Sequence, residues 1–182
     1  LTRSNGLNQT WRYRYDAYGY QVQSIDPMGG IKAWVYDARG RMQSATDELS
    51  RVTRFTYDEL DREIAKQLPD VLGTPSATVQ TIYDDALNTQ TIINENGART
   101  VNTFDVMGRK IQTRDALNRV WIIEYDRNGN KTREQLPTGR GEIQYEYDAS
   151  NRLMAKREPE QKTTLYRYDA QDHVTSETVG RG

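Results

Sequence analysis

The chain has 182 residues and a nearly balanced charge, with 25 Lys and Arg against 26 Asp and Glu. This balance gives no electrostatic reason to expect a nucleic acid or an anionic membrane as a partner. There is no Cys, one His and no apolar stretch long enough to span a bilayer, which excludes thiol chemistry and disfavours a His-rich metal site.

An aromatic residue followed by Asp recurs along the whole chain. The eight dyads are Tyr15-Asp16, Tyr36-Asp37, Tyr57-Asp58, Tyr83-Asp84, Phe104-Asp105, Tyr125-Asp126, Tyr147-Asp148 and Tyr168-Asp169. Successive spacings are 21, 21, 26, 21, 21, 22 and 21 residues. Such regular self-similarity indicates a tandem repeat. The single long interval predicts a loop insertion at residues 69–76.

A turn is predicted directly after each dyad. The residues three positions after the Asp are Gly19, Gly40, Asp61, Leu87, Gly108, Gly129, Asn151 and Asp172. In such a turn the Asp side chain accepts a hydrogen bond from a backbone N–H two residues on, and Gly takes the positive-φ position. Asp and Asn tolerate this conformation better than other residues with side chains. Leu87 does not fit, so we expect an irregular repeat there.

A second turn is predicted about ten residues after each dyad. Its signals lie at residues 26–30, 47–51, 94–97, 115–119 and 137–139. The segments between turns have strand character, as in residues 51–57, where β-branched and aromatic residues alternate with polar ones. No segment has the uninterrupted length of a helix. The sequence therefore predicts an all-β fold of consecutive antiparallel hairpins, about 21 residues each, forming one long sheet.

The dyad aromatics share a strand face with the residues two positions before them. Those residues are Tyr13, Trp34, Phe55, Thr81, Asn102, Ile123, Tyr145 and Tyr166. Stacked repeats would align them into an aromatic stripe. Because Leu, Ile, Val and Phe are scarce, we expect this stripe to pack between neighbouring hairpins rather than to bind ligands.

These residues resemble the tyrosine-aspartate (YD, or Rhs) repeat, whose pattern is close to Tyr-Asp-x-x-Gly-Arg-Leu-x-x-x-x-Asp-x-x-Gly. Residues 36–42 and 104–109 match it almost position for position, and the resemblance covers nearly the whole chain. It implies a single array over residues 1–182, with no separate catalytic domain, that forms a strip of the hollow shell seen in Rhs toxins, Tc toxin C components and teneurins.

The resemblance also implies a role and partners. In the bacterial toxins the shell encloses a C-terminal toxic domain, which an autoprotease segment releases. The chain begins at Leu1 and lacks a signal peptide and that protease segment, so we expect it to be part of a longer, secreted or cell-surface bacterial protein. Its expected partners are the remaining repeats and the enclosed domain, with self-association through sheet edges.

No residue is predicted to be catalytic or to bind a cofactor or a metal. Eight equivalent dyads do not suit an active site, and we interpret their members as turn and packing residues. The segment from Asp126 to Asn130 resembles the start of a calcium-binding loop. The rest does not match, because Lys131 and Pro137 occupy the positions that require Gly and Glu. His173 is expected to be an exposed turn residue.

Two alternatives remain open at the level of sequence. Rows of aromatic residues on a flat sheet can stack on sugar rings, which would make the chain a carbohydrate- or cell-surface-binding module. Two repeats together have about the length of a propeller blade, which would make eight repeats a four-bladed β-propeller.

Overall fold

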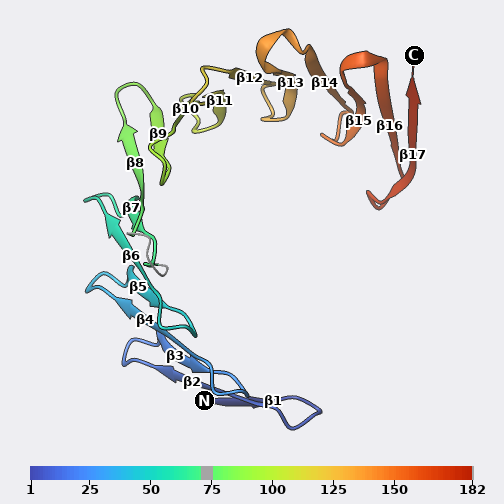
Figure 1. Ribbon diagram of the computed structural model, residues 1–182. Helices are drawn as coiled ribbons and strands as arrows, with labels where there is room; N and C mark the ends of the chain where they lie inside the picture. Colours follow the sequence, from blue (N-terminus) through green and yellow to red (C-terminus); the bar gives the residue numbers. More distant parts are fainter. Residues whose placement is uncertain (71–75, 182) are drawn as a thin grey trace. The chain divides into compact units, whose positions relative to one another are not determined.

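The computed structural model describes residues 1–70 and 76–181, and this part of the chain is all-β. It contains seventeen strands and no α-helix, which confirms the predicted hairpin repeats (Figure 1). Two second turns take the form of short 3-10 segments, η1 (Pro137–Gly139) and η2 (Pro159–Gln161). Residues 71–75 of the predicted insertion lie outside the described residues.

The chain divides into two compact units. The first consists of residues 1–82 and 92–98, and the second of residues 83–91 and 99–182. The strands that begin in the first half of the chain are β1 (Thr2–Ser4), β2 (Thr10–Tyr15), β3 (Gln21–Ile25), β4 (Ile31–Tyr36), β5 (Met42–Thr46), β6 (Val52–Tyr57), β7 (Glu63–Gln67), β8 (Thr78–Asp84) and β9 (Thr89–Ile93). Strands β1 to β8 pair antiparallel, each with the next in sequence.

The second unit repeats this arrangement. Its remaining strands are β10 (Arg99–Phe104), β11 (Lys110–Arg114), β12 (Val120–Tyr125), β13 (Lys131–Gln135), β14 (Glu142–Tyr147), β15 (Leu153–Arg157), β16 (Lys162–Tyr168) and β17 (Val174–Arg181). They too pair antiparallel in sequence order. In each unit eight consecutive strands therefore pair without a break, whereas a propeller would need a break after every fourth strand.

A β-bulge lies in the second strand of each regular hairpin, opposite the dyad aromatic. In β6 and β7, Thr56 lies opposite Ala65 while Tyr57 lies opposite Glu63, so Ile64 is the extra residue. The same register shift occurs at Tyr15, Tyr36, Phe104, Tyr125, Tyr147 and Tyr168. A bulge increases the local twist and redirects side chains. Here it falls next to the predicted turn in every case.

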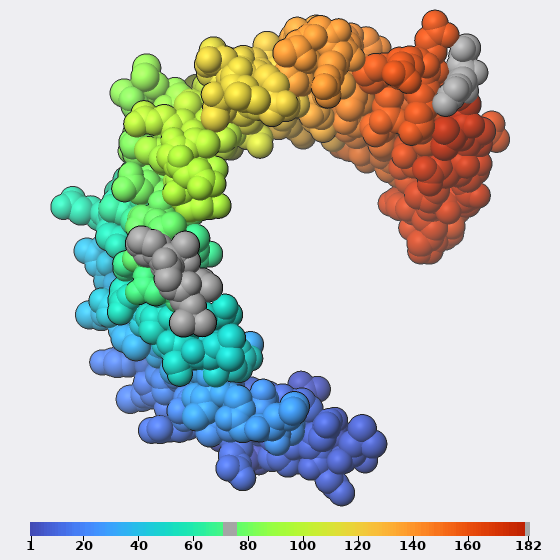
Figure 2. Space-filling model, in the orientation of Figure 1, coloured from blue at the N-terminus to red at the C-terminus, as the bar shows by residue number. Residues whose placement is uncertain are grey.

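The hairpins bury few residues completely. Among the described residues only Asn102, Pro137, Ala155 and Thr164 are buried. On β6 the aromatic residues Phe55 and Tyr57 are half-buried, whereas Arg54 and Thr56 on the other side are exposed. In Figure 2 the colours change gradually along each unit, because each strand packs mainly against its neighbours in sequence. Contacts between consecutive hairpins must therefore supply much of the stability.

No helix among the described residues is long and apolar enough to cross a membrane.

Candidate functional site

The carboxylate of each dyad Asp closes the turn that follows it. In the turn after Tyr57, the backbone N–H groups of Leu60 and Arg62 both donate to Asp58 Oδ1 at 2.9 Å. The same pair of bonds, from the second and fourth residues after the Asp, forms at Asp16, Asp37, Asp105, Asp126, Asp148 and Asp169. The residue between these donors has a positive φ in all seven turns. This is the turn geometry that the sequence predicts.

We call the fourth residue after the dyad Asp the linking residue, and in six repeats its side chain contacts the second carboxylate oxygen. The linking residues are Tyr20, Arg41, Arg62, Asn88, Arg109, Asn130, Arg152 and His173. All four arginines donate from Nε to Oδ2 of their own dyad Asp at 2.7 Å. Asn130 makes the corresponding bond at 2.9 Å, and His173 Nδ1 lies 3.1 Å from Asp169.

These bonds favour the charged form of the carboxylates. The backbone N–H of Arg109 lowers the pKa of Asp105 and its side chain adds to the effect, while desolvation opposes it. The backbone and side chain of Arg152 lower the pKa of Asp148 in the same way. Hydrogen bonds to a carboxylate stabilise the ionised form, so both groups are poised as anions at neutral pH.

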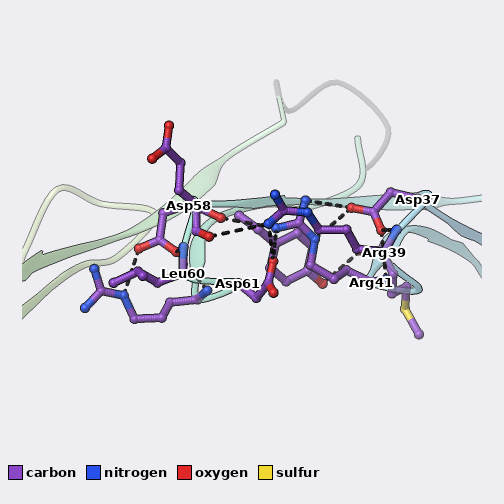
Figure 3. A network of polar contacts seen from close by, with 10 residues as sticks. Asp37, Arg39, Arg41, Asp58, Leu60 and Asp61 are labelled. Carbon is purple, nitrogen blue, oxygen red and sulfur yellow. Dashed lines mark hydrogen bonds and ion pairs between the residues drawn. The ribbon is translucent and has the colours of Figure 1, made fainter.

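The linking arginine also reaches the next hairpin (Figure 3). The guanidinium of Arg41 lies over the ring of Tyr57, 4.9 Å from its centroid, and Arg41 Nη1 donates to the carbonyl of Asp58 at 3.1 Å. Arg109 repeats both contacts with Tyr125 and Asp126, and Arg152 repeats them with Tyr168 and Asp169. Arg41, Arg109 and Arg152 thus each join their own dyad to the following one through an ion pair, a hydrogen bond and a cation–π contact.

The tyrosine hydroxyls make a second connection, in the opposite direction along the chain. Tyr57 donates to the carbonyl of Met42 at 2.9 Å, and Met42 is the register partner of Tyr36 beside the bulge. Four further dyad tyrosines bind the equivalent carbonyl of the preceding hairpin: Tyr36 to Gln21, Tyr125 to Lys110, Tyr147 to Lys131 and Tyr168 to Leu153. We call the combined arginine and tyrosine contacts the dyad ladder.

The repeat at Asp84 departs from this pattern, as the sequence predicts from Leu87. Its carboxylate accepts from the N–H groups of Ala86 and Leu87, so the second bond moves by one residue. The positive φ moves with it, to Asn88. Phe104, in the next hairpin, has no hydroxyl and instead donates its backbone N–H to the carbonyl of Asn88 at 2.9 Å.

The aromatic residues two positions before the dyads are half-buried rather than fully enclosed. Tyr145 lies beneath the ammonium of Lys131, at 4.6 Å from its ring centroid, and Phe55 lies 6.0 Å from Lys66. Asn102 occupies the same position in β10, where it bonds to Gln90 and Thr113. The predicted stripe is therefore a mixed aromatic and polar surface.

The sequence did not reveal the bulges or the tyrosine hydroxyl bonds. The bulges depend on the pairing register of two strands, and the hydroxyl bonds depend on a backbone carbonyl of another strand, so no single-residue pattern marks either. One signal was present: Tyr occupies seven of the eight dyads, whereas a purely apolar packing role would also suit Phe.

The dyad carboxylates are engaged in holding turns, which leaves them poorly placed to act on a substrate. No group of three or more His, Cys, Asp or Glu residues in the described part of the chain could hold a metal ion. His173 lies at an exposed turn, with 77% of its side chain accessible.

The fold and the repeated turns define a protein made of tandem β-hairpin repeats linked by side chains. The RHS Repeat family matches residues 36–70 and 147–182, and both matches begin at a dyad tyrosine. Two curated proteins of Dickeya dadantii (strain 3937) are similar: the probable deoxyribonuclease RhsB at 29% identity and the probable deoxyribonuclease RhsA at 28%. Residues 36–70 and 147–182 are therefore Rhs/YD repeats, and the chain as a whole is similar to Rhs proteins.

Each of these relatives matches 86% of this chain, but the chain spans only 12% of their length. Among solved structures, the crystal structure of TcdB2-TccC3 is similar over 99% of this chain and 14% of its own, with a TM-score of 0.51 and 15% identity. This likeness extends the hairpin-repeat fold to a chain of very different sequence.

Proposed function

We propose that this chain is a structural segment of the shell of a secreted bacterial Rhs-type toxin, in which it helps to enclose a C-terminal toxic domain. The observation that carries the proposal is the dyad ladder, which joins consecutive hairpins through their side chains without a large apolar core. Such a sheet suits a wall, because it extends by adding hairpins. The Rhs repeat matches and the Rhs relatives support the same role.

In this proposal residues 1–182 form one array without a catalytic domain, and the dyads are structural. Any nuclease or other toxic activity belongs to a different part of the parent protein. The partners are the neighbouring repeats and the enclosed domain. β17 pairs with β16 along one side, and we expect its other side to add a further hairpin or a second copy of the chain.

Protease protection in the parent protein tests the proposal. The domain that follows the repeats should resist added protease in the wild-type protein and become cleavable when Arg109 and Arg152 are both replaced by Ala, since this weakens two steps of the ladder. Replacement of the exposed Arg127 by Ala is the control and should leave protection unchanged. Rapid cleavage of the domain in the wild-type protein as well as in both variants would refute enclosure.

For the isolated chain, we expect self-association through the open sides of the sheet. Light scattering over a range of concentrations should show species larger than a monomer. A single monomeric species at every concentration would contradict the prediction.

A carbohydrate-binding role is the second candidate, and one local feature favours it. Tyr18 is 87% exposed, and Tyr20 stacks on Tyr36 with ring centroids 4.9 Å apart. These residues line an open hollow of about 400 Å³ together with Asp16, Arg39 and others. Calorimetry with a panel of soluble glycans tests this role: micromolar binding that is lost in Tyr18→Ala would support it, and no heat with any glycan would exclude it for that panel.

A further inference from the structure

The third turn position, three residues after the dyad Asp, is not Gly in three regular repeats. Asp61, Asn151 and Asp172 occupy it with φ of 63°, 62° and 65°. A residue with a side chain is strained in this conformation, although Asn and Asp tolerate it best. A contact that uses the side chain would offset the strain.

Each of these three side chains accepts a bond from the linking residue of the preceding hairpin. Arg41 Nη1 lies 2.6 Å from Asp61 Oδ1, and Arg152 Nη1 lies 2.7 Å from Asp172 Oδ1. Asn130 Nδ2 donates to Asn151 Oδ1 at 2.8 Å. Arginine is therefore matched with a carboxylate, and asparagine with an amide.

The second turn position reinforces two of these matches. Arg39 Nη1 lies 3.0 Å from Asp61 Oδ1, so that two guanidinium groups of one turn converge on the carboxylate of the next (Figure 3). Asn128 Nδ2 likewise donates to Asn151 at 2.9 Å. The neighbouring turns thus form a polar interface along the edge of the hairpins.

Gly40 shows the opposite case. The preceding linking residue is Tyr20, and a Cβ atom at Gly40 would lie 2.2 Å from the Tyr20 hydroxyl oxygen. No side chain fits there while Tyr20 keeps its place on Tyr36. At Gly129, by contrast, a Cβ atom would have open space for 4 Å around it, and Arg109 is the preceding linking residue.

We propose that the linking residue of one hairpin and the third turn position of the next form a matching pair that specifies which hairpin follows which. The backbone turns are nearly identical, so backbone pairing alone discriminates poorly between neighbours. A hairpin paired with the wrong neighbour would place Tyr20 against a carboxylate or leave Asp61 without its arginines. Such mismatches disfavour misregistered arrays.

A carboxylate introduced at Gly129 tests the proposal, because Arg109 already lies in the position that Arg41 and Arg152 occupy. Gly129→Asp and Gly129→Ala both place a side chain at positive φ, which Asp tolerates better than Ala, so the part of their difference that depends on Arg109 reports the new pair. In the 182-residue chain we expect Gly129→Asp to melt about 2–4 °C above Gly129→Ala. The difference should shrink markedly when Arg109 is also replaced by Gln, to the intrinsic preference for Asp over Ala at positive φ. Equal melting of the two variants, or a difference that is unchanged by the loss of Arg109, would overturn the proposal.

The reciprocal test is at Gly40. Gly40→Asp should lower the melting temperature by several degrees more than Gly129→Asp, because Tyr20 blocks the side chain. Tyr20→Arg combined with Gly40→Asp should recover at least half of that loss, since it recreates the Arg41–Asp61 pair. If Gly40→Asp alone fails to fold, recovery of the β-sheet circular dichroism in the double variant supports the proposal. A double variant no better than Gly40→Asp would refute it.

Discussion

Two connections between consecutive hairpins of the second unit, which we call steps, are built differently. Between Asp148 and Asp169, Arg152 binds its own dyad and the next, and the hydroxyl of Tyr168 returns to the carbonyl of Leu153. Between Asp84 and Asp105, Asn88 and Phe104 replace the linking arginine and the tyrosine, and a backbone bond between them takes over. The repeat thus tolerates loss of the side-chain contacts where the backbone shifts to compensate.

The Asp84 step also coincides with the division of the chain. The boundaries between the two compact units fall at residues 82–83, 91–92 and 98–99, within and just after this hairpin. The Asp148 step lies wholly inside the second unit. We infer that the dyad ladder makes consecutive hairpins act together, and the following predictions are designed to break or sharpen this contrast.

Acid should have the largest effect, because it neutralises many dyad carboxylates at once. The folded-state pKa values of Asp105, Asp148 and Asp169 are lowered, chiefly by hydrogen bonds from the linking residues. Their contribution to stability is therefore complete above the unfolded-state pKa of about 3.9 and is lost as the pH falls through the lowered folded-state values.

Thermal melts between pH 7 and pH 2 measure this effect. The melting temperature should fall steeply below pH 4, and the amide protons of Arg152 and His173, which donate to Asp148 and Asp169, should lose protection from exchange over the same range. A melting temperature that stays constant down to pH 2 would contradict the role of the carboxylates.

Replacement of one dyad Asp should have the next largest effect, and the two steps should differ. Asp148→Ala removes two backbone bonds and frees Arg152, so we expect the melting temperature to fall by several degrees. Asp84→Ala removes two backbone bonds and is expected to cost about half as much. Thermal denaturation of both variants measures the difference, and equal losses would show that the linking arginine adds little.

The smallest effect is expected from a single tyrosine hydroxyl. Tyr147→Phe removes the 3.0 Å bond to the carbonyl of Lys131, which should cost about 0.5–1.5 kcal/mol of unfolding free energy. Tyr15→Phe is the matched control, because Tyr15 is 47% exposed and its hydroxyl has no hydrogen bond among the described residues. Urea denaturation of both variants checks the prediction, which is wrong if they lose the same stability.

The repeated turn could be predicted from the sequence because its determinants are local. An Asp that accepts from its second and fourth following N–H groups, with Gly, Asp or Asn between them, needs only a few consecutive residues. The same reasoning correctly marked Leu87 as the irregular position. It did not mark the turn at Pro159, Glu160 and Gln161, where two residues without typical turn character have a positive φ.

The sequence by itself determined the all-β class, the hairpin repeat and the position of the first turns, since each depends on spacing and on the conformational preferences of neighbouring residues. Only the tertiary structure decided that Tyr57 binds Met42, that Arg41 reaches Asp61 and that Gly40 lies beneath Tyr20. These partners are 15 to 20 residues apart. Such contacts form only when two hairpins are paired in register, and strand register is a property of the folded sheet rather than of either segment alone.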